Sequence, residues 1–145
     1  DLVVGSGGNE VGQNKMETRL YLNNGKGRFT RSETKLPSTG DNVAIITSYD
    51  FDNDGDEDLF IGARSVVGTY GIDPKHLLLE NDKGNFKDVT DRKGFALKKA
   101  GMITDATWAD TNNDGKKDLL WPQGPRNRRR PHGSQTGKTP SHPER

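Results

Sequence analysis

The chain repeats itself with a period of 57 to 60 residues, and this repetition constrains its fold more than any other feature. DLVVGSG at residue 1 returns as DLFIGAR at residue 58 and, more loosely, as DLLWPQG at residue 118. RLYLNNGKGRFT from Arg19 matches HLLLENDKGNFK from His76 at an offset of 57, and NVAIITSYDFDNDGDEDL from Asn42 matches MITDATWADTNNDGKKDL from Met102 at an offset of 60. Three separate segments agree on one period, which indicates one structural unit that recurs along the chain.

Each period has the pattern of short β-strands. AIITSYDF and TDATWAD alternate between apolar and polar residues or are rich in β-branched residues. DLFIG and HLLLEN are short apolar runs, and NGKGRF and NDKGNF are glycine-containing turns. About four short strands in ~60 residues is typical of one blade of a β-propeller. DRKGFALKKAG is the segment expected to form a short helical turn or an irregular connection. We therefore predict an all-β fold, a partial β-propeller of about two blades.

The composition agrees with many strands and turns and a small core. Hydrophobic residues make up 28% of the chain, and there are 18 glycines. The chain has no cysteine, which excludes a disulfide framework and a zinc-thiolate site, and it has no apolar run long enough to span a bilayer. It begins with aspartate in the middle of a repeat, which we interpret as the mark of a fragment whose signal segment lies elsewhere.

The charge divides the chain into two parts. Residues 125–145 hold five arginines, one lysine and one glutamate, for a net charge of +5, whereas the other 124 residues carry −4. We expect a repeat region over residues 1–121, with units near 1–57, 58–117 and a truncated 118–121. A disordered basic tail is expected over residues 122–145, and a reading-frame or gene-model artefact is an alternative origin for it.

The stretch DFDNDGDEDL, residues 50–59, places aspartates at alternate positions of a tight loop. Such a charge density is tolerable when the carboxylates share a cation. Ca²⁺ takes 6–8 oxygen ligands at ~2.3–2.6 Å and fits this set better than zinc or copper. Gly55 is expected to adopt a positive φ for the sharp reversal. The predicted ligands are Asp50, Asp52, Asp54 and Asp58 by their side chains and Asp56 by its backbone carbonyl.

The stretch DTNNDGKKDL, residues 110–119, is a diluted copy of this loop, with Gly115 at the turn. An EF-hand shares the first six positions but requires a glutamate at position 12 between two helices, where this chain has Ile61 and Trp121. A solvated acidic turn without metal is the other alternative. The predicted ligands are Asp110, Asn112, Asp114 and Asp118 by side chains, Lys116 by its carbonyl, and Asp1 as the last ligand of a preceding loop.

These loops and strands resemble a known repeat family. The acidic loop followed by DLFIGAR is similar to the FG-GAP or VCBS-type repeat of integrin α-subunit propellers and of bacterial secreted proteins. The segments DFDNDGDEDLFIGAR, YGIDPKHLLLEND, FKDVT and GMITDATWADTNNDGKKDLLW more specifically resemble bacterial VCBS-repeat proteins with an ASPIC/UnbV-type domain. Over residues 1–121 the resemblance implies a fragment of a propeller, commonly of seven blades, with calcium in the hairpin loops within a blade.

The charge balance favours a structural role for the metal. Four carboxylates overcompensate the charge of Ca²⁺, which leaves little Lewis acidity for catalysis. We interpret the protein as a non-enzymatic, calcium-braced scaffold, secreted or attached to the cell envelope, whose protein or glycan ligand is unknown. The alternative is the non-catalytic propeller part of a secreted glycan lyase or hydrolase with its active site elsewhere. Nucleic-acid binding through the RNRRR run is a third interpretation and is less favoured.

Other residues that are common in functional sites are better explained by packing. His76 is interpreted as an ordinary strand residue, and Trp108, Trp121 and Tyr70 as blade-packing residues instead of a carbohydrate platform. GSGG and NNGKG lack the spacing of a phosphate-binding loop.

Overall fold

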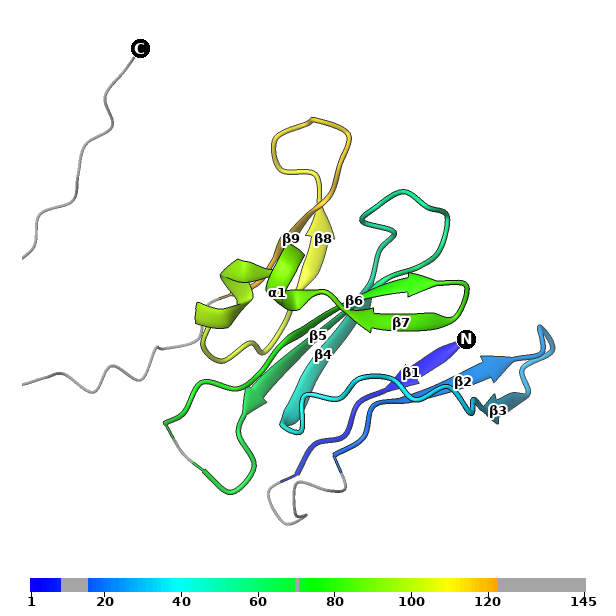
Figure 1. The fold of residues 1–145 in the computed structure, drawn as a ribbon, viewed down its shortest axis with the longest axis horizontal. Coiled ribbons are helices and arrows are strands. Elements are labelled where there is room, and N and C mark those ends of the chain that lie inside the picture. Colours follow the sequence, from blue (N-terminus) through cyan, green and yellow to red (C-terminus); the bar gives the residue numbers. More distant parts are fainter. Residues whose placement is uncertain (9–15, 70, 123–145) are drawn as a thin grey trace, which may run out of the picture.

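The computed structural model describes residues 1–8, 16–69 and 71–122. Within these ranges the chain forms three antiparallel sheets and little helix, which confirms the predicted all-β class (Figure 1). Tyr70 and most of the predicted basic tail, residues 123–145, lie outside the described residues.

The strands follow one another along the chain, and sequential strands are neighbours in every sheet. The first sheet contains β1 (Leu2–Val4), β2 (Arg19–Asn23) and β3 (Phe29–Arg31). The central sheet contains β4 (Asn42–Ser48), β5 (Leu59–Ser65), β6 (Leu77–Asp82) and β7 (Asn85–Asp88). A short helix α1 (Thr90–Lys93) and a 3-10 helix η2 (Phe95–Lys99) lead to the third sheet, β8 (Thr107–Ala109) and β9 (Asp118–Leu120).

The central sheet is the four-stranded unit that the repeat predicts. Its last hairpin turns through Lys83 and Gly84, whose φ values of 51° and 89° are those of a two-residue turn suited to the twist of antiparallel strands. The sheet runs from Asn42 to Asp88. Its first strand, β4, precedes Asp58 in the sequence, and β5 to β7 follow it. The acidic loop therefore joins the first two strands of one sheet.

Both faces of the central sheet are covered, because successive side chains of a strand point to opposite faces. Ile61, Leu77 and Leu79 pack toward the first sheet, with Leu20 and Val3. Phe60 and Leu78 pack on the other face, against the segment after β7 and the third sheet. The remaining members of these two clusters are Leu36, Leu59, Val43, Ile46 and Phe86 in the first, and Val89, Leu97, Ala100, Ile103, Ile45, Phe51, Ala106, Trp108, Leu119 and Trp121 in the second.

The contact between neighbouring sheets occurs twice in the same form. The backbone N–H of Val43 donates to the carbonyl of Ser6 at 3.1 Å, and Ile103 donates to Ala63 at 3.1 Å. In each case a glycine precedes the acceptor and leaves room for the incoming aliphatic side chain: a Cβ on Gly62 would lie 2.9 Å from Ile103 Cγ2. We call this recurrent contact the inter-sheet joint.

The register of the first sheet differs by one residue from the sequence match. At the offset of 57, Leu20 matches Leu77, but Leu2 pairs with Tyr21 whereas Leu59 pairs with Leu79. Leu20 therefore occupies the structural place of Leu78. The extra residue is taken up in the turn between β2 and β3, which has five residues between paired Asn23 and Phe29.

Candidate metal centre

The loop between β4 and β5 reverses the chain through residues with positive φ. Gly55 has a φ of 96°, as predicted for the sharp reversal, and Asn53 has a φ of 60°. The loop between β8 and β9 repeats this backbone, with Gly115 at 84° and Asn113 at 60°. Strands flank both loops, in place of the two helices of an EF-hand.

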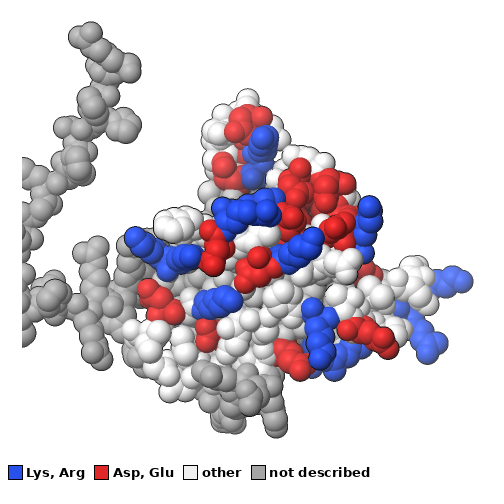
Figure 2. Space-filling model, in the orientation of Figure 1, with Lys and Arg blue, Asp and Glu red and all other residues white. Residues whose placement is uncertain are grey.

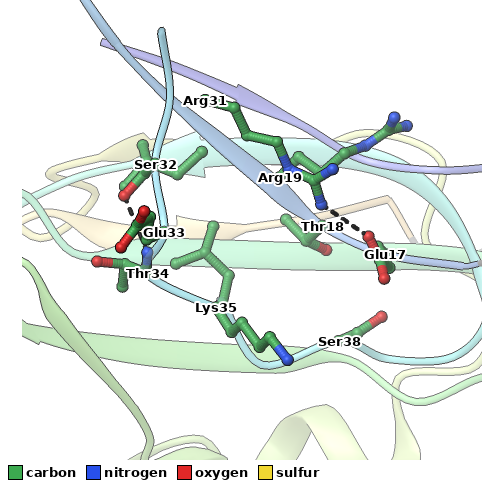
Figure 3. Close-up of a pocket in the computed structure, with 11 residues that line it drawn as sticks. Glu17, Thr18, Arg19, Arg31, Ser32, Glu33, Thr34, Lys35 and Ser38 are labelled. Atoms are coloured by element: carbon green, nitrogen blue, oxygen red, sulfur yellow. Dashed lines mark hydrogen bonds and ion pairs between the residues drawn. The ribbon is translucent and has the colours of Figure 1, made fainter.

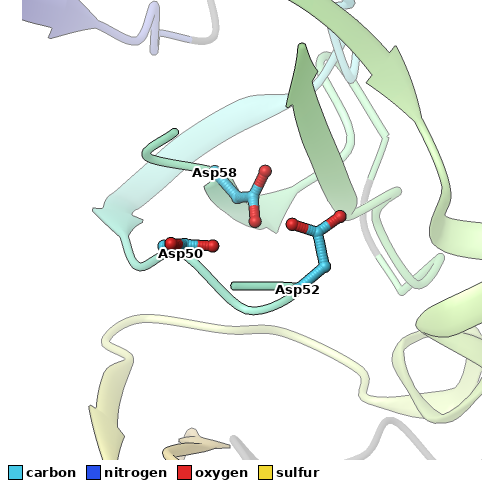
Figure 4. A group of neighbouring side chains, drawn as sticks. All are labelled: Asp50, Asp52 and Asp58. Carbon is cyan, nitrogen blue, oxygen red and sulfur yellow. The ribbon is translucent and has the colours of Figure 1, made fainter. Parts of the chain in front are cut away.

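Three carboxylates of the first loop converge. One oxygen from each of Asp50, Asp52 and Asp58 lies within 4.8 Å of the others (Figure 4). Oxygens on opposite sides of one calcium ion are at most ~5 Å apart, because each Ca–O bond is ~2.3–2.6 Å long. Asp52 Oδ1 is buried and has no hydrogen-bond partner among the described residues. The donor set and its spacing therefore fit a hard dication such as Ca²⁺.

Asp58 is the fully buried member of this group. Its Oδ2 accepts a hydrogen bond from the backbone N–H of Phe51 at 3.0 Å, and its Oδ1 accepts one from Asn81 at 2.8 Å. Burial raises the pKa of the Asp58 carboxyl above its ordinary value, although the two backbone hydrogen bonds oppose this. Asp58 thus connects the loop to β6 and carries a charge that is costly without a nearby cation.

Asp50 and Asp54 organise the loop backbone. Asp50 accepts hydrogen bonds from the N–H groups of Asp54 at 3.2 Å and Gly55 at 3.0 Å. Asp54 Oδ1 accepts from the N–H of Asp56 at 2.9 Å, and Asp54 does not join the converging group. The Asp56 side chain accepts from the N–H of Lys83 at 2.8 Å, in the turn between β6 and β7. The side chain of Asp56 is therefore engaged outside the loop, and its carbonyl role stays a prediction.

The second loop repeats the backbone hydrogen bonds with fewer charges. Asp110 accepts from the N–H groups of Asp114 at 3.2 Å and Gly115 at 2.9 Å. A backbone hydrogen bond from Lys116 lowers the pKa of Asp114. Asn112 donates its amide to Asp114 at 2.9 Å. Among the described residues, this loop forms no group of three converging carboxylates like that of the first loop.

The last aspartate differs between the loops in its surroundings. Asp118 accepts a hydrogen bond from the backbone N–H of Thr111, as Asp58 does from the backbone N–H of Phe51. Asp118 also accepts one from the Thr111 hydroxyl and, unlike Asp58, it is exposed. Asp1 accepts from the N–H of Asn23 at 2.9 Å, in the manner of Asp58 and Asn81. The position of a last ligand is thus preserved at Asp1, and the role of Asp1 in metal binding stays a prediction.

Lys93 is a member of the site that the sequence pattern does not indicate. Its ammonium lies 3.3 Å from Asp52 Oδ2 and 4.8 Å from the centre of the Phe51 ring, and it also pairs with Glu80. The hydrogen bond with Glu80, together with that to Asp52, raises the pKa of Lys93. Lys93 is 41 residues from Asp52 and belongs to α1, so only the tertiary fold brings it here.

The surface reflects the unequal charge of the two loops. Figure 2 shows acidic side chains gathered over the loop between β4 and β5, whereas the loop between β8 and β9 carries both signs. The first loop, residues 50–58, has six acidic residues and no basic one, and the second, residues 110–118, has three acidic residues and two lysines. The first loop is the stronger candidate for cation binding.

His76 has a structural environment. It lies directly before β6 and is buried, where its Nδ1 accepts from the N–H of Ala63 at 3.1 Å and its Nε2–H donates to the carbonyl of Gly101 at 2.8 Å. Burial lowers the pKa of His76, so the neutral ring is favoured. The His76 ring therefore accepts the hydrogen bond of a β5 backbone N–H beyond the last paired residues of β5 and β6, Ile61 and Leu77.

The two tryptophans pack between sheets. The Trp108 ring lies 5.3 Å from Tyr49 and 6.4 Å from Phe51, measured between ring centres. Trp121 contacts the same cluster of buried residues. Both side chains are partly buried, in agreement with the packing role predicted for them.

A shallow groove of about 470 Å³ lies between β2 and the segment after β3 (Figure 3). Glu17 and Arg31 form an ion pair of 3.0 Å across it. Its lining also includes Arg19, Glu33 and Lys35, so both signs of charge are present. The groove favours no single charge of ligand.

The fold and the site together define a repeat protein of stacked antiparallel sheets with acidic loops between strands. Residues 1–61, which include the first sheet, β4 and the first acidic loop, match the family model described as FG-GAP-like repeat. No curated protein and no solved structure matches the chain. In the described part of the chain, neither helix is long and apolar enough to cross a membrane.

Proposed function

We propose that the chain is a calcium-binding propeller module in which the metal stabilises the fold, and that it serves as an extracytoplasmic scaffold for interaction with a protein or glycan ligand. The observation that carries the proposal is the convergence of Asp50, Asp52 and Asp58, with one buried oxygen of Asp52 unpartnered in the described part. The match to an FG-GAP-like repeat over residues 1–61 supports the same class of module.

The position of the loop supports a structural role for the ion. The loop closes the hairpin of β4 and β5, and Asp58 and Asp56 also connect it to Asn81 and Lys83 of the next hairpin. An ion held by these carboxylates would fix two hairpins of a sheet that has no disulfide. Asp50, Asp52 and Asp58 would hold the ion, with Asp54 and the Asp56 carbonyl as further ligands.

The expected affinity agrees with action outside the cytosol. Calcium loops of extracellular modules commonly bind at ~10⁻⁴–10⁻³ M, so they are filled outside the cell and empty in the cytosol. Binding to the folded state alone stabilises that state in proportion to the logarithm of the calcium concentration. The second loop, with Asp110, Asn112, Asp114, Lys116 and Asp118, is proposed as a weaker site because it carries less negative charge.

Thermal unfolding in millimolar CaCl₂ and then in EGTA tests the proposal. We expect calcium to raise the unfolding midpoint by several degrees, because only the folded loops gather the ligands. Asp50→Ala should remove most of this shift, and Asp110→Ala only a small part.

The matched control is Asp91→Ala, which removes an exposed carboxylate of α1 outside both loops. It should keep the full calcium shift. An equal midpoint in CaCl₂ and EGTA for the wild-type chain would contradict structural calcium.

A further inference from the structure

Lys93 places a fixed positive charge against a predicted ligand of the first loop. Its ammonium is 3.3 Å from Asp52 Oδ2 and pairs with Glu80 Oε2 at 2.5 Å, while the Phe51 ring lies beneath it. The Lys93 side chain is 34% exposed and that of Asp52 is 24% exposed. The contact lies at the surface, so solvent screens part of the attraction, while the Phe51 ring and the two carboxylates hold the ammonium in place.

Lys93 is distinguished from the other cations near the loop. Among the described residues, it is the one lysine or arginine whose side chain forms an ion pair with a carboxylate of residues 50–58. Lys83 contacts the loop only through its backbone N–H, which donates to Asp56. Asp52 thus has one oxygen bound to an ammonium, and its other oxygen is buried without a partner in the described part of the chain.

The second loop provides an internal comparison. The residue equivalent to Asp52 is Asn112, which is neutral and donates its amide to Asp114 at 2.9 Å. The first loop keeps a carboxylate at this position and neutralises it from α1. The first loop therefore compensates a charge at the third loop position, whereas the second loop has no charge there.

We propose that Lys93 is a built-in counter-cation, which competes with the divalent ion for Asp52 and so sets the calcium affinity of the first loop. This inference rests on the proposed calcium binding. In the metal-free loop, Lys93 relieves the repulsion among Asp50, Asp52 and Asp58. When the ion binds, it shares Asp52 with the ammonium, and two like charges on one carboxylate weaken each other.

Competition of this kind predicts changes of opposite sign. Removing the ammonium should strengthen calcium binding and, at the same time, destabilise the metal-free protein. A residue that merely holds the loop in shape would weaken both when removed. The expected increase in affinity is on the order of tenfold, as for one unit charge near the ion in a partly solvated site.

The experiment is a calorimetric titration with CaCl₂, paired with thermal unfolding in EGTA. It uses an Asp110→Ala background, which removes a predicted ligand of the second loop so that the first loop is measured alone. Lys93→Met should bind calcium about tenfold more tightly and should unfold at a lower temperature in EGTA. Lys93→Arg keeps the charge and should retain the wild-type affinity.

Lys98→Met is the matched control. Lys98 likewise pairs with a carboxylate, Asp91 at 2.8 Å, and lies over a ring, Phe95 at 5.5 Å, but its ion pair is outside both acidic loops. Its removal should leave calcium affinity near the wild-type value.

Calcium affinity that is unchanged or weaker in Lys93→Met would overturn the inference and leave the proposed function intact. An equal gain in Lys98→Met would overturn it as well, since the effect would then be one of net charge. If the Asp110→Ala protein binds no calcium at the first loop, the proposed function itself fails together with the inference.

Discussion

At the level of single residues, two buried ionisable side chains, Asp58 and His76, are held by specific partners. Asp58 bonds to Phe51 and Asn81, and His76 bonds to Ala63 and Gly101. A buried polar group without a partner costs free energy, so these hydrogen bonds make the burial tolerable. Each of these side chains joins segments that are distant in sequence.

His76 makes stability depend on pH. Its pKa is lowered in the folded state, mainly by burial, so the unfolded chain takes up the proton first as the pH falls. The stabilisation is complete above the ordinary value of about 6.5 and is lost as the pH falls through the window below it, by at most about 1.4 kcal/mol per pH unit. Urea unfolding in metal-free buffer between pH 7.5 and 5 should show this slope.

His76→Gln removes the titrating group and should flatten the pH dependence in that window. A wild-type slope that persists in His76→Gln would contradict the assignment to His76.

The sequence predicts residues within a loop better than residues across the fold. The ligand spacing and Gly55 follow from the local pattern DFDNDGDEDL, since a turn and its glycine are properties of neighbouring residues. Asn81 and Lys93 could not be predicted in this way. They reach the loop through strand pairing and through α1, and nothing near them in sequence marks a metal centre.

At the level of strands and sheets, the inter-sheet joint explains the small residue at the fifth position of DLVVG and DLFIG. Gly62 lies between Ile45 and Ile103, and Gly5 lies against Val43. A side chain at either place would hold the sheets apart. The recurring glycine is thus a packing requirement of the repeat, and it does not indicate a phosphate-binding loop.

Gly62→Ala should destabilise the protein by about 1–3 kcal/mol, the usual range for overpacking a core. The new Cβ would lie 2.8 Å from Ile45 Cγ2 and 2.9 Å from Ile103 Cγ2. Chemical unfolding monitored by tryptophan fluorescence measures the loss. Gly7→Ala is the control, because its Cβ would meet nothing closer than Val43 O at 3.5 Å, and it should change stability little. Equal stability of Gly62→Ala and wild type would contradict the close-packed joint.

The strand register shows where prediction from the repeat ends. The sequence alignment at 57 residues finds the strands and turns correctly, because the alternation of apolar residues persists over each segment. It misplaces β2 by one residue, since an alignment of similar letters does not detect an extra residue absorbed in a turn. Which face a side chain occupies depends on that single residue: Leu20 pairs with Val3 as Leu78 pairs with Phe60, whereas the sequence match aligns Leu20 with Leu77, which points to the opposite face.

Over the whole molecule, stability should be greatest in the central sheet and lowest at the outer strands. β5 and β6 have hydrogen-bonded neighbours on both sides and buried clusters on both faces. In contrast, all residues of β3 are exposed. Such differences set local opening free energies.

Native-state hydrogen exchange measures this distribution. We expect the slowest amides in β5 and β6, with those of β3 and β9 exchanging much faster, because the outer strands can open without disrupting either cluster. Added calcium should slow exchange at the amides of Phe51 and Asn81, which donate to Asp58. Exchange in β3 as slow as in β5 would contradict this order.

The inter-sheet joint also has a geometric meaning. Its two copies, from Ser6 to Val43 and from Ala63 to Ile103, join successive sheets through the same hydrogen bond beside a closely packed glycine. Applied repeatedly, a fixed rotation generates a ring, and the angle of one step determines how many sheets close it. A methyl group added at one of these glycines would change the angle of its own joint, and the closure of a ring depends on every such angle.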